Sequence, residues 1–75
     1  TRATCVAALR DEAETWVRSP AIRQTLRALA DELDAKGPHV AMATASEAMD
    51  MATTPAQVEA YQTALAMISE CEEEP

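Results

Sequence analysis

Two cysteines, Cys5 and Cys71, stand near opposite ends of the chain and are the residues best suited to covalent chemistry. A disulfide between them would close a loop of almost the whole chain and contribute about 4 kcal/mol in the chain-entropy description. The alternative is a pair of buried free thiols, which behave as small apolar side chains in a reducing compartment. The sequence leaves both open. Localisation therefore stays undecided between the cytoplasm and an exported location, which the bond would favour.

His39 is the single histidine and the only imidazole that could join the two cysteines in a metal site. Structural zinc sites usually carry their cysteines in closely spaced pairs, and this chain has no such pair. A haem held by His39 together with Met42 or Met49 has equally little support from the spacing of the ligands. We therefore expect no metal and no other cofactor.

Catalytic groups are as scarce as metal ligands. Ser19 and Ser46 have no base within the chain other than His39, so a nucleophilic serine has little to activate it. A glycine-rich phosphate-binding loop needs several glycines, and Gly37 is the only one. The sequence predicts that this protein is not an enzyme.

The charged residues are divided unevenly along the chain, whose formal net charge is −7. Residues 1–36 hold all 6 basic groups and an equal number of acidic ones, whereas residues 37–75 are acidic with no basic group. Such asymmetry bears on partners and solubility. Direct nucleic-acid binding is not expected, because an acidic surface repels phosphates. Instead Glu59, Glu70, Glu72 and Glu73 are predicted to meet a basic protein surface.

All 4 methionines lie in the second half of the chain. Methionine fills irregular gaps in a core, and it also forms adaptable binding surfaces. Core packing among the alanines is the simpler interpretation. However, a helix over this region would place Met42 and Met49 on a different stripe from Val40 and Met51, and both stripes cannot face one small core. Met42 and Met49 are therefore included among the predicted partner-binding residues.

Apolar residues at helical spacing and local breakers divide the chain into four segments. A helix is expected over residues 4–17. A second is expected over residues 20–36, with Ser19 as its N-cap and Gly37 at its C-terminus. Exposed pairs four residues apart, such as Glu14 with Arg18 and Arg27 with Asp31, should support these helices.

The second half contains one segment with two interpretations. Residues 38–52 either form one helix, or residues 38–43 form a loop before a short helix that Thr44 caps. The fourth helix is clearer, because Thr54 followed three residues later by Gln57 makes a capping box.

These segments predict an all-α fold, a small antiparallel bundle of three to four helices in a single domain over residues 1–75. Short connections place both chain ends at one end of such a bundle, so Cys5 and Cys71 should be neighbours. The core is predicted to contain Trp16, Leu29, Leu33, Tyr61, Leu65 and Ile68.

For function, the sequence points to binding. We expect a protein–protein interaction module, either an inhibitor of the antitoxin, immunity or phage type that masks a basic surface of its target, or a protein that forms a homo-oligomer. The alternative is an exported, disulfide-locked bundle that binds a ligand or partner. No apolar run approaches the roughly 18 residues of a membrane span. The composition, rich in alanine and arginine and poor in lysine, is typical of GC-rich bacteria or their phages.

Overall fold

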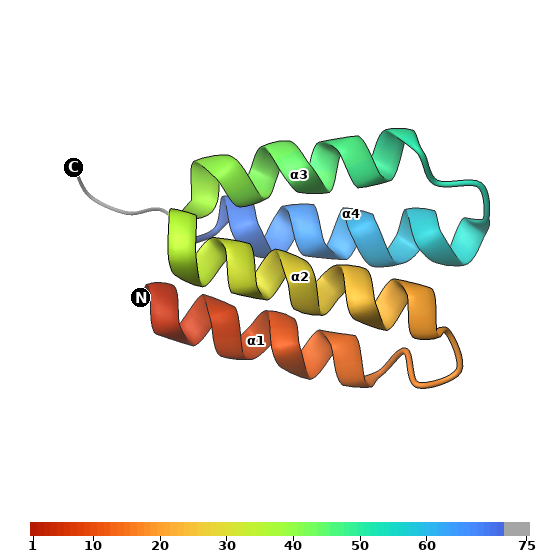
Figure 1. Ribbon diagram of the computed structural model, residues 1–75, viewed down its shortest axis with the longest axis horizontal. Coiled ribbons are helices and arrows are strands. Elements are labelled where there is room, and N and C mark those ends of the chain that lie inside the picture. Colours follow the sequence, from red (N-terminus) through yellow and green to blue (C-terminus); the bar gives the residue numbers. More distant parts are fainter. Residues whose placement is uncertain (72–75) are drawn as a thin grey trace.

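A computed structural model shows an antiparallel bundle of helices and describes residues 1–71 (Figure 1). Over this range the helices are α1 (Arg2–Glu14), α2 (Pro20–Lys36), α3 (Pro38–Asp50) and α4 (Pro55–Ser69), without any strand. Consecutive helices run in opposite directions, and the start of α1 and the end of α4 lie at the same end of the bundle. The predicted fold class is confirmed.

Local sequence accounts for where the helices start. Each of α2, α3 and α4 has a proline in its first turn, where the missing N–H has no intrahelical partner to lose. The predicted capping box at α4 is confirmed: the Thr54 side chain accepts from the Gln57 N–H, and the Gln57 side chain accepts from the Thr54 N–H. Ser19 does occupy the N-cap position of α2, but its side chain makes no capping hydrogen bond.

One glycine both ends α2 and begins α3. Gly37 has φ 95°, in the left-handed region that favours glycine, and its N–H bonds to the carbonyl of Leu33. The helix then restarts directly at Pro38, so the alternative of a loop over residues 38–43 is wrong. Thr44 lies inside α3 and does not cap it; its hydroxyl donates to the carboxylate of Glu32 on α2.

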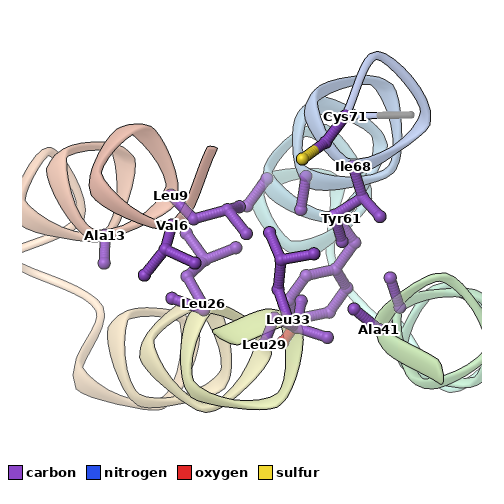
Figure 2. Packing of buried hydrophobic residues seen from close by; sticks show 14 of the residues in the cluster. Val6, Leu9, Ala13, Leu26, Leu29, Leu33, Ala41, Tyr61, Ile68 and Cys71 are labelled. Atoms are coloured by element: carbon purple, nitrogen blue, oxygen red, sulfur yellow. The ribbon is translucent and has the colours of Figure 1, made fainter. Parts of the chain in front are cut away.

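The core lies along the line where the helices meet, and α2 contributes most of its large side chains (Figure 2). Leu29 and Leu33 are fully buried, and Tyr61 and Ile68 reach them from α4, as predicted. The buried residues of α2 recur at helical spacing on one face: Ile22, Leu26, Leu29, Ala30 and Leu33.

The predicted end of the first helix is wrong by one turn. α1 ends at Glu14, after which the N–H of Trp16 bonds to the carbonyl of Ala13 and that of Ser19 bonds to Trp16. The chain uses these tighter turns to reverse direction before α2. As a result Trp16 is only partly buried against the core, and Val17 is 58% exposed.

Alanines decide how α4 is rotated. Ala60 and Ala64 are fully buried, whereas Leu65, predicted in the core, is partly buried at its edge. Small side chains at a helix contact allow the helix axes to approach closely. The same holds for α3, in which Ala41 and Ala45 are the buried residues.

Candidate interaction surface

The two cysteines lie where the predicted topology puts them. The structure joins Cys5, on the first turn of α1, to Cys71, just after α4, in a disulfide with the Cα atoms 6.1 Å apart. That separation is within the usual range for the bond. Cys71 is 4% exposed, so this half of the bond is part of the core.

With both sulfurs in this bond, the thiolates that a metal site would need are consumed. Residues 1–71 contain no cluster of three or more histidine, cysteine or acidic side chains that could hold an ion. His39 lies in the first turn of α3, exposed to solvent. The structure therefore does not assemble the Cys5, Cys71 and His39 set considered from the sequence.

Two acidic side chains of the first half, Glu14 and Asp31, join α1 to α2 through ion pairs. Arg10 pairs with Asp31 at 3.0 Å, and Arg27 pairs with Glu14 at 2.5 Å. Both ion pairs cross between the two helices. The expected pairs within one helix, Glu14 with Arg18 and Arg27 with Asp31, are not the ones formed, because the partner helix offers a carboxylate to Arg10 and to Arg27.

The acidic groups of the second half have no such partners. Glu47, Asp50, Glu59 and Glu70 are exposed, and within residues 1–71 none of them forms an ion pair. Their charges therefore face solvent. The predicted partner-binding residues Glu72 and Glu73 lie outside the described residues.

An open cavity of ≈ 310 Å³ lies between α2, α3 and α4. Its lining residues are Thr25, Ala48, Met51, Gln57 and Tyr61. The Gln57 side-chain oxygen is already occupied by the cap of α4. No charged side chain is among the lining residues. The cavity shows that the Tyr61 side of α4 faces α3.

Apolar side chains lie along the junction of α3 and α4, which are neighbours in the bundle (Figure 1). On α3, Thr44 marks the side that faces α2, and Met42 and Met49 lie about 140–160° around the helix from it, towards α4. On α4, Val58 and Leu65 lie three residues before and four residues after Tyr61, so they share its side, towards α3. We call these four residues, Met42, Met49, Val58 and Leu65, the α3–α4 strip.

The α3–α4 strip is neither core nor fully solvated. Val58 is 36% exposed, and Met42, Met49 and Leu65 are partly buried against the core. Met51 is different, because it is 79% exposed and lies towards α2. The strip is therefore an apolar surface that a partner could cover further.

Exposed carboxylates lie further around the same two helices. Glu59 and Glu70 are eleven residues apart, which places them on one line of α4, about 16 Å long. Asp50 follows Met49 on the outer side of α3. We call Asp50, Glu59 and Glu70 the acidic flank. The structure thus places Met42 and Met49 at the contact with α4, whereas Glu59 and Glu70 lie about 160–180° around α4 from Tyr61, on the side that faces away from α3.

The sequence predicted Leu65 as a core residue, and it did not single out Val58 or Asp50 as partner-binding residues. The available signal was the spacing: Val58 and Leu65 are seven residues apart, as are Met42 and Met49. Two such pairs on antiparallel neighbours form a continuous surface only if the helices are rotated as observed.

No family model, no curated protein and no solved structure matches this chain. Within residues 1–71, no helix has both the length and the apolar character needed to cross a membrane.

Proposed function

We propose that this protein is an interaction module that binds a basic protein surface through the α3–α4 side of the bundle. The observation that carries this proposal is that the exposed carboxylates of residues 37–71 form no ion pair and have no basic residue in their own half of the chain. Glu14 and Asp31 are neutralised by arginines across the α1–α2 contact, whereas the acidic flank has no cation within residues 1–71. An unpaired row of charge on one side of a small domain supports recognition of an oppositely charged surface.

Apolar side chains on the same two helices support a protein as the partner. A typical interface combines an apolar centre with a polar rim, and charged residues at the rim steer the encounter. Here Met42, Met49 and Leu65 would supply apolar contacts, and the nearest charges would be those of Asp50, next to Met49, and Glu59, next to Val58. Methionine adapts to different partner shapes.

The biological form that fits these features is an inhibitor. The acidic flank would bind the cationic surface of a nucleic-acid-binding target, in the place that nucleic-acid phosphates would otherwise occupy. Antitoxins, immunity proteins and phage inhibitors are the protein types that would act in this way. A homo-oligomer is the weaker form, because a two-fold contact through this side would set one acidic flank against the other.

A titration with a cationic peptide tests the proposal. We expect an oligolysine peptide to shift the amide resonances of α3 and α4 at low salt, and the shifts to fade with added salt. The variant Glu59→Gln/Glu70→Gln should weaken this binding several-fold. Its matched control is Asp11→Asn/Asp34→Asn, which removes the same charge from the α1–α2 side.

Two results would overturn the proposal. One is that both double variants weaken the peptide equally, which would mean that only total charge matters. The other is that the shifts map to α1 and α2.

A second candidate function rests on the Cys5–Cys71 disulfide. Such bonds persist mainly in oxidising compartments, so it supports an exported bundle that acts outside the cytoplasm. Mass spectrometry of the protein isolated from its natural source without reductant would test this. A mass lower by two hydrogen atoms is the expected result, and a pair of free thiols would remove the candidate.

A further inference from the structure

We propose that the open cavity between α2, α3 and α4 binds a small neutral molecule that has an apolar body and a carbonyl oxygen. The inference does not require a basic partner, so it goes beyond the function proposed above and is tested separately. The observation that carries it is the hydroxyl of Tyr61. This polar group belongs to an almost fully buried side chain that lines the cavity, and it has no hydrogen-bond partner within residues 1–71.

Tyr61 differs from the other core residues because it carries a polar group that the core does not use. The side chain is 5% exposed and packs within the buried cluster. Figure 2 shows it extending from α4 towards α2, among the leucines of that helix. A buried hydroxyl normally has a hydrogen-bond partner, because leaving it unpaired costs free energy. The residues that the structure describes provide none for Tyr61.

The hydroxyl is open to the cavity and is not sealed inside the core. In residues 1–71, the one partly or fully buried residue with a side-chain nitrogen or oxygen that is both shut off from solvent and unpaired is Arg23, at its Nε atom. The Tyr61 oxygen therefore keeps contact with solvent, and the cavity that Tyr61 lines provides that contact. A molecule in the cavity can thus reach a hydrogen-bonding group that apolar side chains otherwise surround.

The remaining lining residues set the polarity of the ligand. Ala48, Met51 and the ring of Tyr61 provide apolar walls. Gln57 provides a second donor, because its side-chain oxygen is used by the cap of α4, whereas its amide nitrogen has no partner within residues 1–71. Thr25 is left as an acceptor, since its hydroxyl donates to a backbone carbonyl of α2. Two free donors beside apolar walls favour a ligand whose polar group is an acceptor oxygen.

Size and charge narrow the class further. The cavity volume of ≈ 310 Å³ is at the lower end of the range for ligand sites, so the occupant is small. No charged side chain is among the lining residues, and moving an ion into such a site costs free energy that no opposite charge offsets. The ligand is therefore neutral, for example a small ketone, ester, lactone or amide.

Other occupants satisfy only part of the cavity. An aliphatic side chain of a protein partner would cover the apolar walls but leave the Tyr61 hydroxyl unpaired. Water pairs with the hydroxyl, but it does not remove the apolar walls from solvent. A carbonyl compound does both, so it displaces the water with a gain in binding free energy.

NMR titration of the full chain with benzene derivatives would test the inference. Acetophenone carries the neutral carbonyl, and benzoate and benzamidinium are analogues of similar size with a negative and a positive charge. We expect acetophenone to shift the amide resonances of Thr25, Ala48 and Tyr61. It should bind at least about fivefold more tightly than either ion, because an ion loses hydration in the cavity without gaining an opposite charge.

Tyr61→Phe isolates the contribution of the hydroxyl. The change removes one oxygen that has no partner within the described residues, so the free energy of unfolding should not fall. We expect the variant to bind acetophenone about fivefold more weakly, since one hydrogen bond is worth about this factor. Toluene, which has no acceptor oxygen, is the control ligand and should bind Tyr61→Phe and the unmodified protein equally.

A matched pair of alanine variants tests the location. Ala48→Leu fills the cavity and should abolish the binding of acetophenone and toluene. Ala43→Leu makes the same change on α3 at an exposed residue that does not line the cavity, and it should leave both ligands bound.

Each step of the inference has a result that would overturn it. If acetophenone does not shift the three amide resonances, the cavity holds only water and is not a ligand site. Tighter binding of benzoate or benzamidinium would refute the neutral class. If Tyr61→Phe weakens acetophenone and toluene equally, the hydroxyl is not the anchor. Equal effects of Ala48→Leu and Ala43→Leu would place the binding elsewhere on the bundle.

Discussion

Removal of the Cys5–Cys71 disulfide should lower the stability of the bundle severely. The bond joins residues separated by 66 positions, so it restricts almost the whole unfolded chain. In the chain-entropy description a loop of this size is worth about 4 kcal/mol. For a domain of this length, each kcal/mol corresponds to a shift in Tm of about 4–8 °C. The expected fall in Tm is therefore about 16–32 °C.

The position of the bond in the fold strengthens the expectation. It links α1 to the end of α4, the first and last helices, which no short loop connects. The Cys71 sulfur lies 3.9 Å from the Thr1 carbonyl, but a disulfide sulfur has no proton to donate to it. Within residues 1–71, the apolar packing of α1 against α4 would remain if the bond were removed.

Thermal unfolding followed by circular dichroism at 222 nm provides the assay, since a helical bundle has its main signal there. The untreated protein is compared with the same protein in a phosphine reductant and with Cys5→Ala/Cys71→Ala. Alanine avoids burying a hydroxyl at Cys71, which is 4% exposed.

The reductant should not change the Tm of the double variant, because this variant has no Cys5–Cys71 disulfide to reduce. The double variant therefore controls for any other effect of the reductant. A fall in Tm smaller than about 5 °C would refute the reasoning, because the bond would then restrict the unfolded chain far less than its loop length requires.

Three further predictions concern caps, core and ion pairs, and urea unfolding measures each. Thr54→Ala should lower the free energy of unfolding by about 1 kcal/mol, because the Thr54 side chain caps α4. Ser19→Ala should change the free energy of unfolding by less than about 0.5 kcal/mol, because the Ser19 side chain makes no capping hydrogen bond. Equal losses for the two variants would contradict this prediction. Leu29→Ala should cost about 3 kcal/mol because Leu29 is fully buried, and Leu65→Ala about 1 kcal/mol because Leu65 lies at the edge of the core; the reverse order would show that α4 is rotated differently. Arg27→Gln should cost no more than about 0.5 kcal/mol, since its ion pair is 52% and 54% exposed, and a larger loss would show that the pair is shielded from water.

The sequence carried enough information for the elements and their order. Thr54 with Gln57 marks the start of α4, and Gly37 marks the end of α2, because capping and a positive φ depend on neighbouring residues alone. The buried face of α2 could also be predicted from the sequence, because the large apolar residues of this helix all fall on one face. From these elements and their short connections, the topology and the proximity of Cys5 to Cys71 followed.

Tertiary packing decided which faces meet. α3 and α4 each have more than one apolar stripe, and a helical period does not say which of them the neighbouring helices will cover. Fully buried alanines such as Ala41 and Ala60 set the rotation, because only small side chains let these helices approach closely. That rotation leaves Leu65 only partly buried at the edge of the core, and the approach of α1 to α2 pairs Arg27 with Glu14. Local sequence determines where a helix begins and ends, whereas the sides that meet are set by the shapes and charges of segments distant along the chain.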